Sequence, residues 1–181
     1  MVMSQFMGDY KEKYNKLQWF MDKVLASNPG STCFVKTDIS QPGKVLFNRF
    51  YMCLNAIKKG FKDGCRKVIG LDGCFLKGVC RGQLLSAIAK DGNGQMYPLA
   101  WAIVQVECKD TWSWFLRALR DDLDMGSGGG FVLITDMQKV SNNYVLFTSI
   151  MQIVLVNYAL VNESSSFLSL FTTVNYSFEF T

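Results

Sequence analysis

Apolar residues near the start of the chain recur at helical spacing. Across Asp9–Ser27 they return every three or four positions with charged residues between them, which predicts an amphipathic helix. An extended stretch is expected over Thr32–Ile39, and a second helical face follows it, ended by Gly60 and Gly64. The residues of that second face are Phe50, Cys53, Leu54, Ile57 and Phe61. We therefore expect residues 1–61 to form a helical lead-in.

The pattern changes to that of strands from residue 66 onward. Three apolar or β-branched runs predict strands at Val68–Leu71, Gln83–Lys90 and Tyr97–Val106, and a fourth is predicted at Phe131–Ile134. A helix capped by Asp110 or Thr111 is expected before the fourth strand. Its apolar face would consist of Trp112, Phe115, Leu116, Leu119 and Leu123. The glycine-rich 126–130 segment precedes a strand rather than a helix, so it predicts a plain loop and not a phosphate cradle.

The order strand, strand, strand, helix, strand predicts an α/β fold. Short links make the first three strands an antiparallel meander, and the helical crossover lets the fourth strand run parallel to the first. Two aspartates, Asp72 and Asp136, come directly after the first and fourth strands. Neighbouring strands lie about 4.8 Å apart. Carboxylates at that separation can bind one Mg²⁺ together or bridge a pair of ions.

Charge and cysteine content narrow the classes of function only a little. The chain has a net charge of +4, and residues 1–139 hold all 19 Lys and Arg but 13 of the 15 acidic residues. That distribution fits an anionic partner and equally an ordinary soluble domain. The chain has six cysteines, none spaced CxxC, and no histidine, which disfavours a zinc site and any Ser-His or Cys-His catalytic pair. Since no signal-peptide-like run opens the chain, we expect reduced thiols, mostly buried, inside the cell.

The composition changes after Lys139. Residues 140–181 contain no Lys, Arg, Gly or Pro, and their only acids are Glu163 and Glu179. The uncharged stretch Tyr144–Val161 has 18 residues, the minimum for a membrane span, but polar residues interrupt it and no basic residues flank it, so we disfavour a membrane. We interpret residues 140–181 as a tail foreign to the domain that does not pack on it.

Several strings between Gly64 and Lys139 resemble the transposase domain of plant Mutator-like elements (MULE transposases). They are GCRKVIGLDGCFLKG at 64–78, GQLLSAIAKDGNGQMYPLAWAIVQVE at 82–107, DTWSWFL at 110–116 and ITDMQK at 134–139. The resemblance extends to SNPGST at 27–32 and covers roughly residues 10–139. It divides the chain into a lead-in at 1–61, the amino-terminal part of the transposase domain at 62–139, and the tail.

The resemblance implies a partial RNase H-like fold and a DDE-type transposase that cleaves and joins DNA strands with two Mg²⁺ or Mn²⁺ ions. Its first two catalytic, metal-binding acids fall on Asp72 and Asp136. The family's third acid, a glutamate beyond a Cys/His segment, has no counterpart in these residues, so we expect the chain as given to be inactive. The resemblance also implies DNA as partner, no small-molecule substrate, and a nuclear location. Two alternatives stay open: a domesticated DNA-associated regulator, and a non-functional pseudogene product.

Other residues invite simpler interpretations. Asp91 lies in the Asp-Gly-Asn-Gly segment and is expected to shape a turn. Glu107, at the end of the third strand, is expected to cap or pair locally. Trp101, Trp112 and Trp114 are expected to be core residues rather than a surface for stacking on bases.

Overall fold

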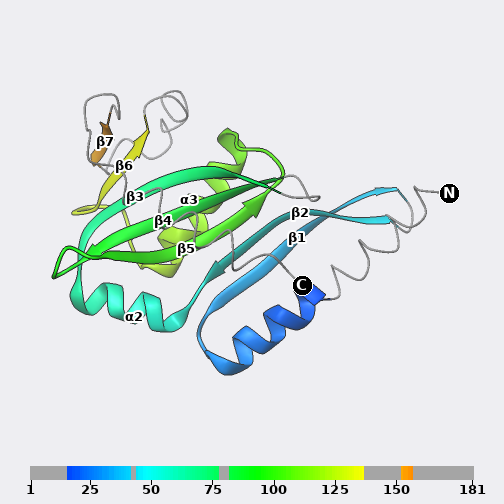
Figure 1. Ribbon diagram of the computed structural model, residues 1–181, viewed down its shortest axis with the longest axis horizontal. Helices are drawn as coiled ribbons and strands as arrows, with labels where there is room; N and C mark the ends of the chain where they lie inside the picture. The colour runs from blue at the N-terminus through cyan, green and yellow to red at the C-terminus, as the bar shows by residue number, and fades with distance from the viewer. Residues whose placement is uncertain (1–15, 42–43, 78–81, 137–151, 157–181) are drawn as a thin grey trace.

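A seven-stranded mixed sheet in the order β1-β2-β5-β4-β3-β6-β7 forms the body of the protein (Figure 1). The computed structural model describes residues 16–41, 44–77, 82–136 and 152–156. The strands are β1 (Thr32–Gln41), β2 (Lys44–Cys53), β3 (Cys65–Leu76), β4 (Gly82–Asp91), β5 (Met96–Val104), β6 (Val132–Asp136) and β7 (Gln152–Val156). The helices are one over residues 16–27, α2 (Asn55–Gly64) and α3 (Lys109–Asp122).

The centre of the sheet has the predicted α/β topology. β3 pairs antiparallel with β4, and β4 pairs antiparallel with β5, which gives the expected meander. The chain then passes through α3 and returns as β6, which pairs parallel with β3 on its other side. The crossover helix allows this parallel pairing because two parallel strands cannot be joined by a tight turn. β3 is therefore an interior strand, with β4 on one edge and β6 on the other.

The lead-in is less helical than expected: the extended stretch predicted at Thr32–Ile39 lies in β1, but part of the predicted second helical face lies in a strand. Residues 16–27 and Asn55–Gly64 are helical, but β1 and β2 form an antiparallel hairpin between them. β2 also pairs antiparallel with β5, so the hairpin extends the central sheet. Phe50 and Cys53, which we assigned to a helical face, lie in β2, and α2 begins only at Asn55.

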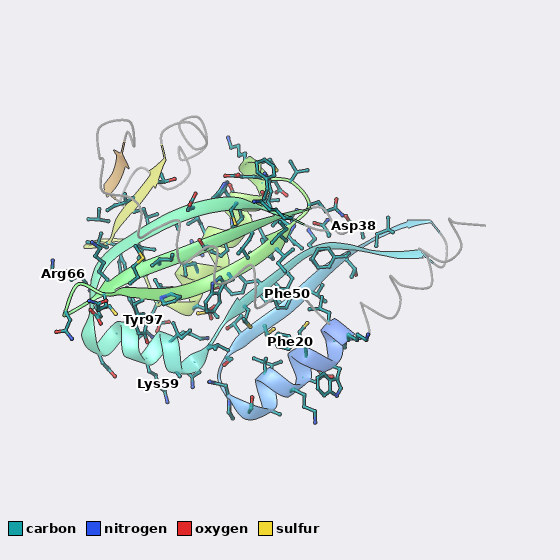
Figure 2. All side chains as sticks on the ribbon, in the orientation of Figure 1. Phe20, Asp38, Phe50, Lys59, Arg66 and Tyr97 are labelled. Atoms are coloured by element: carbon teal, nitrogen blue, oxygen red, sulfur yellow. The ribbon has the colours of Figure 1, made fainter. Side chains whose placement is uncertain are left out.

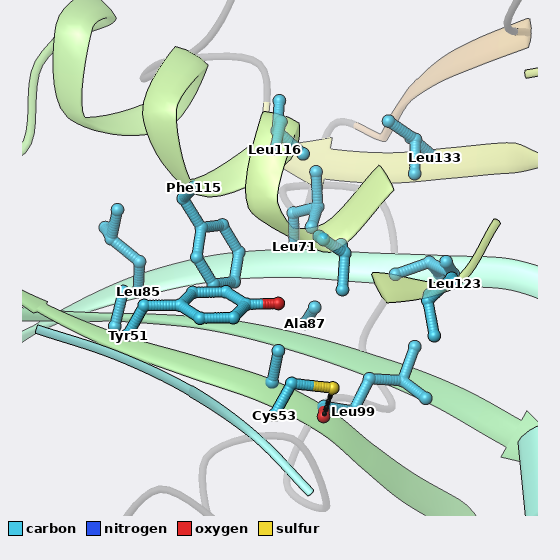
Figure 3. Close-up of a cluster of buried hydrophobic side chains, with 14 of the residues drawn as sticks. Tyr51, Cys53, Leu71, Leu85, Ala87, Leu99, Phe115, Leu116, Leu123 and Leu133 are labelled. Atoms are coloured by element: carbon cyan, nitrogen blue, oxygen red, sulfur yellow. Dashed lines mark hydrogen bonds between the residues drawn. The ribbon is translucent and has the colours of Figure 1, made fainter. Parts of the chain in front are cut away.

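One face of the sheet holds the main core, beneath α2 and α3. Residues of β2, β3, β4, β5 and β6 point to this face, and they meet the apolar side of α3 (Figure 3). Tyr51 of β2 lies against Phe115 of α3, with ring centroids 5.8 Å apart. The Cys53 thiol donates a hydrogen bond of 3.3 Å to the Leu99 carbonyl, which ties β2 to β5 within the core. Trp112 is 2% exposed, so it belongs to the core as predicted.

A smaller cluster covers the opposite face near β1 and β2. Met21 of the helix over 16–27 packs with Cys33 of β1 and Phe50 of β2, and all three are buried. Phe20 and Phe50, labelled in Figure 2, belong to the helix and the strand that meet there. The two helical layers therefore lie on opposite faces of the sheet.

The start of α3 differs in detail from the prediction. The N-cap residue is Cys108, and the Thr111 hydroxyl accepts a 2.9 Å hydrogen bond from the Cys108 N–H. Asp110 does not cap the helix; its carboxylate pairs with Arg49 of β2 at 2.6 Å. Arg49 also lies over the Trp114 ring, 5.1 Å from its centroid. These contacts attach the first turn of α3 to β2.

The predicted separation of the tail from the domain is wrong for residues 152–156. These residues form β7, which pairs parallel with β6 from Val132↔Gln152 to Asp136↔Val156. β6 therefore has a partner on the edge that we expected to be unpaired. The rest of the 140–181 tail, including Glu163 and Glu179, lies outside the described residues, as does most of the Tyr144–Val161 stretch. In the part of the chain that the structure describes, no helix has the length and apolar character needed to cross a membrane.

Candidate functional site

Asp72 lies near the carboxyl end of β3, on the face opposite the main core. Ile69 and Leu71 point into the core beneath α3 and are almost fully buried, so the two-residue period of the strand turns Asp72 the other way. Asp72 itself is half-buried. β3 is paired with β4 on one side and with β6 on the other, and this pairing fixes the backbone that leads to Asp72.

Two hydrogen bonds fix the backbone and side chain of Asp72. Its Oδ1 accepts the backbone N–H of Gly73 at 2.7 Å, which turns the carboxylate along the chain toward residue 73. Its backbone carbonyl accepts the Ser86 hydroxyl at 3.3 Å. Ser86 is the residue directly opposite on β4 and is 2% exposed. A hydrogen bond from an N–H to a carboxylate stabilises the charged form, which is the form that binds a cation.

Asp136 ends β6, the parallel neighbour of β3. The two strands pair from Val68↔Val132 to Leu71↔Thr135, so Asp72 and Asp136 each follow the last pair on adjacent strands. Parallel strands lie about 4.8 Å apart, which brings the two backbones together as expected. The placement of the Asp136 side chain lies outside what the structure describes.

Glu107 is an acid that lies against Gly73 of β3, and its sequence position predicts only a local role. It lies between β5 and α3, where its backbone N–H donates to the Gln83 side chain and its Oε1 accepts the Trp112 indole N–H at 3.1 Å. Those contacts are local, as expected. Its carboxylate, however, rests on Gly73 of β3: a Cβ placed on Gly73 would lie 2.9 Å from Oε1 and 3.0 Å from Oε2.

The start of α3 next to Glu107 also carries a perturbed thiol. Burial acts to raise the pKa of Cys108, but hydrogen bonds involving Thr111 and the backbone of Asp110 outweigh it and leave the pKa lowered. The Arg49 guanidinium lowers the pKa of the Asp110 carboxyl, chiefly through its hydrogen bond. Negative charge is therefore favoured at the first turn of α3, as expected where helix N–H groups point outward.

The chemistry of these donors fits a hard divalent cation. Asp72 and Asp136 offer carboxylate oxygens from adjacent strand ends, and oxygen is the ligand type that Mg²⁺ and Mn²⁺ prefer. The glycine at 73 leaves room for the Glu107 carboxylate on the α3 face of β3. Among the described side chains, which do not include that of Asp136, no three His, Cys, Asp or Glu residues already stand in a metal-binding arrangement.

Asp91 has the structural role that its sequence predicts. Its Oδ1 accepts the backbone N–H groups of Asn93 at 2.9 Å and Gln95 at 2.8 Å, which shapes the turn between β4 and β5. Trp114 packs edge-on against Phe34, with ring centroids 5.7 Å apart, and so belongs to the core. Asp91 pairs with Cys65, at the opposite end of β3 from the Asp72 region.

Residues 68–146 of the chain match the family model of the MULE transposase domain. The matched segment contains Asp72, Glu107 and Asp136, and it runs from β3 through β6 and seven residues past Lys139. No curated protein and no solved structure matches the chain.

Proposed function

Since residues 68–146 match the family model of the MULE transposase domain, we propose that Asp72 and Asp136 are the first two metal-binding acids of a DDE-type transposase centre. The ancestral reaction of this centre is the cleavage and transfer of DNA strands with Mg²⁺ or Mn²⁺. The proposal includes an RNase H-like relation for the sheet, with β3 as its first strand and β6 as its fourth. We also propose that the protein acts in the nucleus.

One observation carries the proposal. The parallel register of β3 and β6 sets two aspartates, separated widely in sequence, at the ends of neighbouring strands. A structural role would require only one of them, in a turn, whereas a shared cation requires two carboxylates at about this strand spacing. Both aspartates also lie inside the segment that matches the family.

The residues around Asp72 orient it for binding a cation. The Gly73 N–H orients the Asp72 carboxylate, and buried Ser86 fixes the Asp72 backbone from β4. When bound, two divalent ions would supply electrostatic stabilisation of the attacking and leaving oxygens at a phosphodiester. Asp72 and Asp136 would hold such an ion, and the +6 charge of residues 1–139 (19 basic and 13 acidic residues) would attract the polyanion.

The test measures metal binding and DNA binding by the purified chain. We expect Mn²⁺ to bind and to strengthen the binding of a fluorescent DNA duplex, followed by fluorescence anisotropy. Asp72→Asn and Asp136→Asn should remove this metal-dependent gain while leaving the circular dichroism spectrum unchanged. Each substitution removes one charge and keeps the shape of the side chain.

Two results would contradict the proposal. Mn²⁺ binding that survives both substitutions would place the metal elsewhere. DNA binding that is strong but indifferent to metal and to both substitutions would favour a DNA-associated regulator instead. A chain that binds neither metal nor DNA would fit a product that has lost the ancestral function.

A further inference from the structure

We propose that a cluster of basic side chains on β1, β2 and α3 binds the phosphate backbone of DNA. This basic cluster consists of Lys36 of β1, Arg49 of β2 and Arg117 of α3. The inference rests on the proposed function in one respect, the choice of DNA as the polyanion. Lys36 and Arg49 precede residue 68, so most of the cluster lies outside the segment that matches the family.

Strand register and helix spacing bring the three cations of the basic cluster together. Lys36 and Arg49 are directly opposite each other in the β1–β2 pairing, so their side chains lie on the same face of the sheet. That face is the one covered by α3, because Arg49 pairs with Asp110 of α3 at 2.6 Å. Arg117 follows Asp110 by seven residues, which is two helical turns, so both lie on one side of α3.

Aromatic packing and hydrogen bonds fix Arg49 within the basic cluster. Arg49 lies over the Trp114 ring, 5.1 Å from its centroid, and Trp114 packs edge-on against Phe34 of β1. The Arg49 Nε also donates to Asn48 Oδ1 at 2.8 Å. The Arg49 side chain is only 8% exposed. The guanidinium is therefore held in place before any ligand arrives, and a group ordered in advance loses little entropy on binding.

Positive charge exceeds negative charge in the basic cluster. The three cations share one exposed carboxylate, that of Asp110, whose side chain is 78% exposed. The hydrogen bond from Arg49 is the largest cause of the lowered pKa of Asp110, and the charges of Lys36 and Arg117 lower that pKa as well. Lys36 and Arg117 are exposed, and neither forms an ion pair with a residue that the structure describes.

This excess of positive charge fits a phosphate backbone. Exposed lysine and arginine side chains bind DNA phosphates by displacing condensed counterions, and such contacts carry no sequence information. Asp38 of β1 accepts a hydrogen bond from the Asn48 amide, and even with Asp38 counted the three cations outnumber these two acids. The basic cluster lies on the α3 face and Asp72 on the other face of the sheet, so the two can be tested separately.

The experiment measures the binding of a fluorescein-labelled DNA duplex to the full chain by anisotropy, without divalent metal and at a series of salt concentrations. The double variant Lys36→Gln, Arg117→Gln should weaken binding at least about tenfold at low salt. It should also reduce the slope of log affinity against log salt by about 2, since two phosphate contacts are lost. Lys59→Gln, Lys90→Gln removes two exposed lysines from α2 and β4 and is the matched control, expected to stay within about twofold of the wild type.

A third variant, Asp110→Asn, should change the affinity in the opposite direction. Its amide oxygen can still accept the Arg49 hydrogen bond, but the exposed negative charge is lost, so DNA binding should strengthen by about twofold or more. If Lys36 and Arg117 served only to neutralise Asp110, none of these substitutions would change the DNA affinity. Circular dichroism and thermal unfolding confirm that each variant keeps the fold.

Wild-type affinity in the Lys36→Gln, Arg117→Gln variant would place the DNA contact elsewhere and overturn the inference, and so would equal weakening by the control variant. Displacement of the duplex by poly-glutamate as effectively as by unlabelled DNA would identify an acidic protein as the partner and would also overturn it. Mn²⁺ binding that depends on Asp72 in a chain that binds no DNA would overturn this inference alone. Metal-free binding that depends on Lys36 and Arg117, with no effect of Asp72→Asn in Mn²⁺, would support it while contradicting the proposed centre.

Discussion

Asp122, at the end of α3, contacts side chains of β1, β2 and α2. Its Oδ1 pairs with the Lys58 ammonium of α2 at 2.8 Å, and its Oδ2 accepts the Tyr51 hydroxyl of β2 at 2.8 Å. The side chains of Lys58 and Asp122 are only 12% and 8% exposed. Removing one partner of a buried pair leaves the other charge uncompensated, which costs more than the pair contributes.

We therefore predict that Asp122→Ala lowers the free energy of unfolding by about 3–5 kcal/mol. Asp122→Asn should cost less, because the amide still accepts the Tyr51 hydroxyl. Urea denaturation followed by tryptophan fluorescence gives both values. Asp121→Ala, one residue away but exposed and paired only with Arg120 among the described contacts, should change the stability by less than about 0.5 kcal/mol. A similar loss from both substitutions would contradict the buried-pair argument.

Buried thiols make the stability sensitive to alkaline pH. Burial raises the pKa of Cys53 to about 12 and that of Cys33 to about 11, from an ordinary value of 9.0. Burial also raises the pKa of Tyr51. In the unfolded chain these groups lose their protons first, so their contribution to stability is complete below pH 9 and decreases as the pH rises toward their folded pKa values.

The free energy of unfolding should therefore be steady from pH 7 to 9 and fall between pH 9 and 12, by up to about 1.4 kcal/mol per pH unit for each group that titrates. Urea denaturation at a series of pH values checks this. Cys33→Ala should reduce the slope between pH 9 and 11, since that is the window of the Cys33 thiol. An unchanged slope in the variant would show that the Cys33 thiol is not responsible.

Among the elements, β2 shows where sequence reasoning failed. Phe50, Cys53, Leu54 and Ile57 have helical spacing, yet the first two belong to a strand. β2 is buried on both faces: Tyr51 and Cys53 enter the main core, while Phe50 packs with Met21 on the other side. A strand buried on both faces loses the two-residue alternation, so periodicity alone cannot separate it from a helix.

The candidate site could be predicted from the sequence only in part. The strands that end at Asp72 and Asp136 have clear apolar runs, and their parallel pairing follows from the helix between them. The contact of Glu107 with Gly73 depends instead on how the start of α3 docks on the sheet, through pairs such as Arg49–Asp110. The docking of α3 depends on contacts between residues far apart in the chain, and no local sequence pattern predicts such contacts.

The β1–β2 hairpin should be required for folding of the central strands. A fragment of residues 62–181 lacks Tyr51 and Cys53, both 0% exposed, and leaves the β5 edge uncovered. We expect this fragment to lose cooperative thermal unfolding and near-ultraviolet circular dichroism. A matched fragment of residues 30–181, which lacks the helix over 16–27 but keeps the hairpin, should retain both signals. Cooperative unfolding of the shorter fragment would mean that residues 62–139 form an independent unit.

At the scale of the whole molecule, the charge of the proposed centre limits its activity. Two Mg²⁺ ions bring four positive charges and require near-octahedral oxygen ligation. Asp72 and Asp136 follow the last pair of β3 and β6, and we expect them to hold one ion. Glu163 and Glu179 are the remaining acids after Asp136 and lie outside the described residues.

We therefore predict that the purified 181-residue chain does not cleave or join labelled DNA in Mg²⁺ or Mn²⁺, even where it binds one ion. Denaturing gel electrophoresis of the DNA measures this, with Asp72→Ala and Asp136→Ala as matched controls. Cleavage by the wild type that both substitutions abolish would contradict the prediction. It would also direct the search for a further ligand to residues 137–181.

The strand order also decides when the two aspartates can meet during folding. β3, β4 and β5 follow one another along the chain and pair antiparallel, and so do β1 and β2, whereas β6 reaches β3 only after the chain has passed through two strands and a helix. Closing that long loop costs more entropy than closing a hairpin, and parallel pairing is the slower kind to form. Asp72 is therefore positioned by early hairpins, while its contact with β6 belongs to a late step. A cation that bridges the two strands would bind the finished sheet and not its precursors, so it would slow unfolding more than it speeds folding.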